Sequence, residues 1–292
     1  MKDNNIAEIT APPTAIAGLS ADADILESAI YYRLFYDAET VRWKMSEIPW
    51  LNIDKSRITP SLVNLVTEIA FAELTTWSAT HRFFQAFTGD VDFTQWITVW
   101  LYEETKHPQV LMRWLKEAGQ TFDADFLIEG RKTHPFMDSQ MGTLVMNVLS
   151  EIEASSLYLG LSSVVEEPVL KLIAKNLSAD EARHASGFYS YAKKMLDNSD
   201  NPDIERLQAI KVLYLWLMDK KKVKHPVALL TNRVSDQEEF GAYSPELGFG
   251  TEKVHSKMRK MIGQLIGRPL ESKAQVSDTF TELYATVKSL TN

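Results

Sequence analysis

The sequence predicts an all-α protein, and three kinds of observation support that fold class. Glycine and proline are few, 12 and 11 in 292 residues, and most of them fall between long segments rather than inside them. Within those segments the apolar residues recur at three and four positions, which is the period of one helix face. Helix-start signals precede several segments, such as Thr59 before Pro60, a cap followed by a first-turn proline.

The expected helices follow one another in order along the chain. Asp92 with Gln95 resembles a capping box near the start of the third helix, and Glu167 and Asn201 each precede a proline that opens a helix. The second to fifth helices are long enough to enclose a site in the middle of a bundle. The expected ranges are 22–47, 60–88, 93–119, 138–164, 168–197 and 202–223.

The composition changes after about residue 225. The stretch 232–251 is rich in Gly, Ser, Pro and acidic residues, and shorter helices are expected over 252–266 and 274–290. We therefore predict a flexible N-terminal arm over 1–20, a helical bundle over 21–231, and a C-terminal loop with helices over 232–292. The C-terminal part is expected to pack on the bundle or on a partner.

Composition excludes several classes of protein. The chain has no cysteine, which rules out disulfide scaffolds, zinc–thiolate sites, cysteine nucleophiles and iron–sulfur clusters held by this chain alone. The net charge of -8 gives no basic footprint for general nucleic-acid binding. No run of about eighteen apolar residues lacks charge, and the N-terminus has no apolar core of signal-peptide length. We therefore expect no membrane span and a cytoplasmic location.

One short acidic and histidine pattern occurs twice, each time inside an expected long helix. The copies are Glu103-Glu104-Thr105-Lys106-His107 and Asp180-Glu181-Ala182-Arg183-His184. A carboxylate and an imidazole three residues apart project from the same face of a helix. Two such copies facing each other can enclose two metal ions. Spacing alone does not choose between Glu103 and Glu104, because a Glu four residues before a His also shares its face.

A bundle site of this kind needs one more carboxylate from each of the two other long helices. The helix from 60 offers Glu68 and Glu73, and the helix from 138 offers Glu151 and Glu153. The last two lie roughly 200° apart around a helix, so only one of them can point inward. The residues alone leave both choices open.

At this point the chain resembles the soluble acyl-carrier-protein desaturases of the ferritin-like di-iron superfamily. Their doublet reads E-E-x-R-H and D-E-x-R-H, which the two motifs match except for Lys106. Glu153-Ala154-Ser155-Ser156 matches their Glu followed by a small residue and, three positions after the Glu, a hydroxyl. The segments 43–49 and 220–226 are similar to the tryptophan segment before their bundle and the basic, proline-ended segment after it. The resemblance covers about residues 30 to 232.

The resemblance implies a ferritin-like four-helix bundle with flanking helices and a set of site residues. Trp43, His107 and Asp180 would form a hydrogen-bonded route for electrons, and Ser156 would relay a proton on the oxygen-binding side. Glu103 and Asp180 would orient the ligand imidazoles. Ser156 bonding its own backbone and Trp43 acting as a packing anchor are the simpler alternatives. The implied metal ligands are Glu73, Glu104, His107, Glu153, Glu181 and His184.

Three further positions bear on the resemblance: Pro108 departs from it, whereas Leu111 and Leu177 favour it over two related families. Pro108 stands where the family has glycine, and a proline there removes a helical donor to the Glu104 carbonyl, so a kink or widened turn is expected. Leu111 replaces the radical tyrosine of small ribonucleotide reductase subunits. Leu177 replaces the third histidine of arylamine N-oxygenases.

Trp77 and Trp100, each four residues from a predicted ligand, are expected to be core residues that could also line a substrate pocket.

The function expected from this resemblance is dioxygen-dependent oxidation by two iron ions, with manganese as the other suitable metal. The substrate would be an acyl chain tethered to an acyl carrier protein, desaturated or hydroxylated with electrons from a donor such as ferredoxin. The chain is expected to form a homodimer. One alternative is hydroxylation or N-oxygenation of a small amine or aromatic metabolite. A further alternative is a non-catalytic ferritin-like metal-binding protein.

Overall fold

The computed structural model describes residues 24–132, 136–219, 222–223, 247–248 and 250–290. These residues contain helices and no strands, which confirms the all-α class. The predicted arm over 1–20 and most of the loop over 232–251 lie outside the described residues. The helices are α1 (Ile25–Ser28), α2 (Ile30–Val41), α3 (Pro60–Glu73), α4 (Thr76–Ala86), α5 (Val91–Glu117), α6 (Ala124–Gly130), α7 (Gln140–Val164), α8 (Pro168–Asp197), α9 (Pro202–Met218), α12 (Glu252–Ile266) and α13 (Lys273–Leu290).

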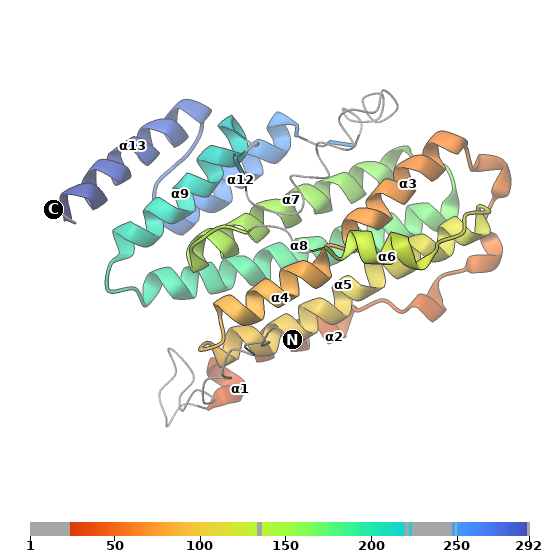
Figure 1. Ribbon diagram of the computed structural model, residues 1–292, viewed down its shortest axis with the longest axis horizontal. Helices are drawn as coiled ribbons and strands as arrows, with labels where there is room; N and C mark the ends of the chain where they lie inside the picture. The colour runs from red at the N-terminus through yellow and green to blue at the C-terminus, as the bar shows by residue number, and fades with distance from the viewer. Residues whose placement is uncertain (1–23, 133–135, 220–221, 224–246, 249, 291–292) are drawn as a thin grey trace, which may run out of the picture.

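The long helices lie side by side and form the centre of the molecule (Figure 1). α7 packs along α8, α8 contacts α5, and α5 contacts α3 and α4, which follow each other end to end. α2 covers α5 on the outside, and α6 packs on α3. The four predicted bundle segments are thus neighbours in space, while their assignment to the ferritin-like family of bundles stays a prediction. None of the helices in the described part of the chain is both long and apolar enough to cross a membrane.

The helix predicted over 60–88 is interrupted after Glu73, where a turn at Leu74 and Thr75 separates α3 from α4. The Thr75 N–H bonds to the Ala72 carbonyl at 3.0 Å, and the Thr76 hydroxyl lies 2.9 Å from the Glu73 carbonyl. Threonine hydroxyls that bond to nearby backbone compete with regular helix bonding. The prediction of one continuous helix was therefore wrong at this turn, which lies at the residue expected to bind metal.

α5 corrects two other expectations. Asp90, not Asp92, caps the helix, because its side chain accepts from the Phe93 N–H at 3.0 Å. Asp92 is buried and accepts from the Tyr31 N–H at 2.8 Å, which ties α2 to α5. The backbone stays α-helical from Val91 to Glu117 across Pro108, so the widened turn expected there is absent.

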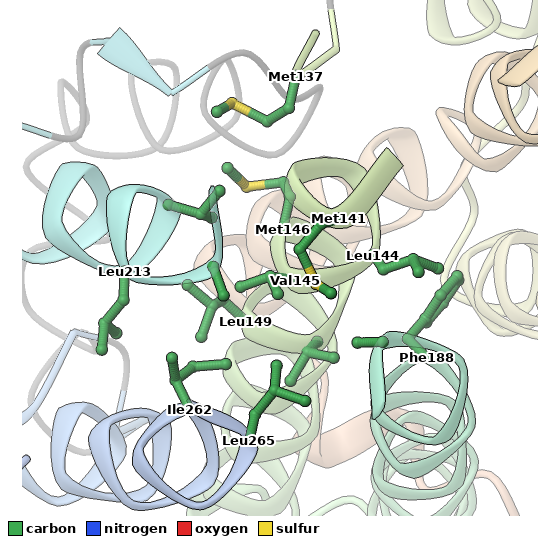
Figure 2. Close-up of a cluster of buried hydrophobic side chains, with 14 of the residues drawn as sticks. Met137, Met141, Leu144, Val145, Met146, Leu149, Phe188, Leu213, Ile262 and Leu265 are labelled. Carbon is green, nitrogen blue, oxygen red and sulfur yellow. The ribbon is translucent and has the colours of Figure 1, made fainter. Parts of the chain in front are cut away.

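The core continues from the bundle into the C-terminal helices. Side chains on one side of α7 meet residues of α8, α9 and α12 in one buried apolar cluster (Figure 2). α13 packs on α9, and α12 packs on both α9 and α7. The C-terminal helices therefore pack on this chain's own helices, one of the two arrangements that were predicted.

Gly187 of α8 sits where there is no room for a side chain. An added Cβ would lie 2.2 Å from the ring of Trp96 on α5. We expect G187A to lower the free energy of unfolding by about 1–3 kcal/mol, because overpacking a tight contact forces neighbouring atoms to move. Denaturant unfolding measures this loss. The control is G89A, since an added Cβ at Gly89 meets nothing within 4 Å. Equal stabilities of the two variants would contradict the close α5–α8 packing.

Candidate metal centre

Carboxylates and imidazoles from α3, α5, α7 and α8 meet inside the bundle. Their potential ligand atoms form two groups, and the atoms of each group all lie within 4.8 Å of one another. Glu104 and Glu181 belong to both groups, so each can bridge two ions. Each group also has one histidine and one further carboxylate. The groups are Glu73, Glu104, His107 and Glu181, and Glu104, Glu151, Glu181 and His184.

The α7 carboxylate that the structure brings into a ligand group is Glu151, and not the predicted Glu153. Glu151 lines a cavity at the cluster together with Asn147 and Ala154, which are four residues before it and three after it on the same helix face. Glu153 is buried but belongs to neither ligand group. The family match at Glu153 depended on a short local pattern, whereas the side-chain direction depends on how α7 rotates against α8.

The change of ligand also removes the basis for the proton relay expected at Ser156. The Ser156 hydroxyl donates to the Ile152 carbonyl at 2.8 Å, which is the backbone bond named above as its simpler alternative. Ser156 does not line the cavity at the cluster. Ala154 stands three residues after Glu151 and supplies no hydroxyl.

Each motif supplies the acid that orients the histidine of the other motif. His107 Nε2 lies 3.2 Å from Asp180 Oδ2, and His184 Nε2 lies 3.1 Å from Glu103 Oε2. The Nδ1 atoms face the carboxylates of the ligand groups, for example His184 Nδ1 at 2.8 Å from Glu104 Oε1. An Nε2–H donated to a carboxylate leaves Nδ1 free to bind metal. This arrangement matches the orienting roles predicted for Glu103 and Asp180.

The expected contacts of Trp43 are also present. Its indole N–H donates to Asp180 Oδ2 at 2.7 Å, and Asp180 in turn meets His107. The Lys106 ammonium lies 4.3 Å from the centre of the Trp43 ring. Arg183 pairs with Asp180 from the other side. These contacts join the half-buried Trp43 to a predicted ligand, while its role in electron transfer stays a prediction.

The orienting acids remain ionised despite their burial. Burial acts to raise the pKa of Glu103, but the hydrogen bond and charge of His184 outweigh it and lower the pKa to about 2. Burial also acts to raise the pKa of Asp180, but the hydrogen bond and charge of His107 outweigh it and lower this pKa to about 2. Ionised acceptors make the stronger hydrogen bonds to the two imidazoles.

The protons of the metal-free cluster lie on Glu104, Glu151 and the two histidines, whereas the contacts of Glu181, first with His107, outweigh its burial and lower its pKa. Burial, together with the negative charge of Glu181, raises the pKa of Glu104 to about 7. Burial and the same neighbour raise the pKa of Glu151 well above its ordinary value. Burial acts to lower the pKa values of His107 and His184, but the surrounding carboxylates raise both. A metal ion entering the cluster would displace these protons.

Two buried atoms in the cluster lie among other potential metal ligands. Glu104 Oε1 lies 2.8 Å from His184 Nδ1, and His107 Nδ1 lies 3.4 Å from carboxylate oxygens of Glu73 and Glu181. A coordinated ion would take the place of the protons that these atoms share. Four carboxylates and two neutral imidazoles are donors suited to iron or manganese, and four negative charges balance two divalent ions. The residues present therefore fit a two-metal centre.

Two hydroxyl groups at the cluster were not predicted. The buried Tyr158 hydroxyl donates to Glu73 Oε1, and the Thr76 hydroxyl lies 3.0 Å from Glu104 Oε2. Tyr158 is seven residues, or two turns, after Glu151 and so lies on the same helix face. That spacing could have identified Tyr158, but the choice of Glu153 pointed to another face of the helix.

Two cavities adjoin the cluster, and they share Glu73, Thr76 and Glu104 as a common wall. The inner cavity, of about 90 Å³, is lined by Trp100, and the outer cavity, of about 270 Å³, is lined by Trp77. Each of the two tryptophans therefore lines one cavity, but the expected core position is wrong for Trp77. Trp100 is buried, whereas Trp77 is 57% exposed.

The orienting acids should control metal affinity. We expect D180N and E103Q each to weaken metal binding by about 10–100-fold, because an amide holds the partner imidazole less firmly in its ligand tautomer. Titration of the metal-free protein with Mn²⁺ measures the affinity. N64Q, a change on α3 outside both ligand groups, is the control. Unchanged affinity in both orienting variants would contradict the crossed arrangement.

No family model matches the chain, and no curated protein matches it significantly. The resemblance to the acyl-carrier-protein desaturases therefore stays a prediction that depends on the motifs.

Proposed function

We propose that the protein is a dioxygen-dependent di-iron oxidoreductase. The observation that carries this proposal is the pair of ligand groups that share Glu104 and Glu181 inside a buried bundle. Such a centre, when loaded, supplies the activation of dioxygen needed to oxidise an unactivated carbon. With two external electrons and two protons, dioxygen converts a C–H group to an alcohol and one water, or a CH–CH pair to an alkene and two waters.

The chain's own residues would prepare the site for this chemistry. Glu103 and Asp180 hold the imidazoles in their ligand tautomers, and the Tyr158 hydroxyl donates a hydrogen bond to Glu73 Oε1. Burial of the cluster excludes bulk water from the ligands. The inner cavity of about 90 Å³ is far below the usual range for small-molecule pockets, about 300–1,000 Å³, which favours dioxygen over an organic substrate there.

The organic substrate would therefore approach from the outer cavity. A carrier-tethered acyl chain is the substrate that the motif resemblance favours, with electrons entering through Trp43, Asp180 and His107. The basic segment 220–224 that would meet an acyl carrier protein lies mostly outside the described residues. The carrier, a ferredoxin-like donor and the homodimer all stay predictions.

The outer cavity also supports a second candidate, hydroxylation or N-oxygenation of a small metabolite. Its volume of about 270 Å³ is close to the lower end, about 300 Å³, of the usual range for small-molecule pockets. That volume suits a compact molecule at least as well as a long acyl chain.

Anaerobic loading with Fe²⁺ tests the proposal. The expected result is two iron ions per chain, followed by dioxygen consumption when a chemical reductant and air are supplied. The double variant E104A/E181A, which lacks both shared carboxylates, should bind little iron and consume no dioxygen above background. Absence of iron in the original protein after loading would overturn the proposal, as would bound iron that never reacts with dioxygen.

A further inference from the structure

The outer cavity lies between α4, α5 and α6 and ends at the metal ligands. Glu73 and Glu104 form part of its wall, and Thr76 between them also faces the inner cavity. A molecule in the outer cavity would therefore have one end next to the carboxylates of the cluster.

Most of the remaining wall is apolar. It includes the side chains of Trp77, Leu101, Pro108, Met112 and Leu127. Pro108, the departure from the family pattern, thus contributes an apolar ring to the cavity and leaves the helix intact. An apolar wall that ends in a few polar groups is typical of sites for amphipathic small molecules.

Arg131 supplies the positive charge of this cavity. Its guanidinium lies 5.2 Å from the centre of the Trp77 ring, and both side chains are exposed. No carboxylate in the described part of the chain forms an ion pair with Arg131, and nearby Glu129 pairs with Lys132. A guanidinium stacked on an aromatic ring keeps its N–H edge available for a bidentate contact with a carboxylate.

The position of Arg131 is set by contacts at the break between α3 and α4. Gly130 packs so closely on Leu74 that an added Cβ would lie 2.6 Å from that side chain. Phe126 of α6 meets Phe71 of α3 edge to face, with ring centres 5.3 Å apart. The end of α6 is therefore held against the wall that carries Glu73, with Arg131 at the edge of the cavity.

We propose that the outer cavity binds a small amphipathic carboxylate. Its carboxylate pairs with Arg131, and its apolar body lies along Leu101, Met112 and Leu127 toward Glu73 and Glu104. The binding part of this proposal is independent of metal, while the statement that the bound molecule is oxidised rests on the proposed function. The cavity would thus select a free acid and orient it with the apolar end toward the cluster.

Calorimetric titration of the metal-free protein with octanoate and with 4-phenylbutyrate tests the binding. We expect saturable binding of at least one acid, with octan-1-ol, which lacks the charge, binding at least about tenfold more weakly. R131A should weaken acid binding by about tenfold or more. The affinity of R131K should be intermediate, because lysine keeps the positive charge but cannot donate two parallel hydrogen bonds to the carboxylate. Circular dichroism checks that these variants fold.

Arg113 provides a matched control on α5. It is also a half-exposed arginine stacked on a tryptophan, with its guanidinium 5.3 Å from the centre of the Trp50 ring, but it pairs with Glu117 and does not line the cavity. R113A should bind the acids as tightly as the original protein. Equal losses in R113A and R131A would overturn the proposal, because they would indicate a general effect of positive charge.

The outcomes separate this proposal from the proposed function. Arg131-dependent acid binding without iron loading or dioxygen consumption would leave the cavity assignment standing and overturn the oxidase. Iron-dependent dioxygen consumption with acid binding that is absent or unaffected by R131A would overturn the cavity assignment alone. Tighter binding of an octanoyl thioester on an acyl carrier protein than of octanoate would also overturn it, because the thioester has no free carboxylate.

Discussion

Replacing Glu151 with alanine is expected to lower the bound iron from two ions per chain to one, whereas E153A keeps both. Glu151 is the only α7 carboxylate in the two ligand groups, and it belongs to the group completed by His184. Removing it leaves that ion with one histidine and the two shared carboxylates. The group with Glu73 and His107 keeps all four of its members.

The two substitutions are closely matched, since both remove a buried glutamate from the same helix. Iron analysis after anaerobic loading gives the stoichiometry, and absorption after exposure to air reports whether a paired centre forms. A full loss of iron in E153A with none in E151A would return the ligand assignment to Glu153 and contradict the orientation of α7.

Metal loading is expected to raise the unfolding temperature substantially. A ligand present at 100 times its dissociation constant stabilises the folded state by about 2.7 kcal/mol, which corresponds to roughly 5–10 °C for a domain of about 150–250 residues. The buried cluster gives a reason to expect this effect, because its ligand atoms converge only in the folded chain, so the ion binds the folded state and not the unfolded one. Mn²⁺ is a suitable probe because it avoids oxidation by air.

The stabilisation of the folded protein by bound metal should increase as the pH rises from 6 to 8. The raised pKa values of His107, His184 and Glu104 mean that the metal-free fold holds protons that the unfolded chain would release. The stability of the metal-free protein therefore falls as the pH rises through these folded-state values. Metal binding requires the deprotonated groups, so its affinity increases over the same range.

Unfolding scans at pH 6, 7 and 8, with and without Mn²⁺, measure this effect, and E104A/E181A is the control. The difference between the unfolding temperatures with and without Mn²⁺ should increase with pH in the original protein and stay small in the variant. A difference in unfolding temperature that decreases toward pH 8 would contradict protonation of the metal-free cluster.

Much of the fold was predictable because the chain gives consistent local signals. The apolar period and the prolines at 168 and 202 located the starts of α8 and α9 correctly. The doublet indicated a cluster that includes His107, Glu181 and His184, because ligands three residues apart on one helix share a face whatever the surrounding fold is, while the resemblance chose Glu104 over Glu103. These features depend on distances along a single helix.

The errors concern features that depend on how one helix lies against another. Glu151 and Glu153 have equally apolar surroundings in the sequence, and the rotation of α7 decides which of them faces the cluster. Asp90 and Asp92 are both reasonable caps, but only the packing of α2 on α5 gives Asp92 its partner at Tyr31. The turn at Leu74 packs against Gly130 across a gap of more than fifty residues, a contact that no local pattern contains.

The crossed acids make the centre sensitive to the alignment of α5 and α8. A slip of one helix along the other by a single turn, about 5.4 Å, would separate Glu103 from His184 and Asp180 from His107 at the same time. Neither motif could then keep even its own imidazole in a ligand tautomer, so a half-assembled centre would have little affinity for metal. Metal binding would therefore report that the two helices have reached their native register, and misaligned chains would remain metal-free.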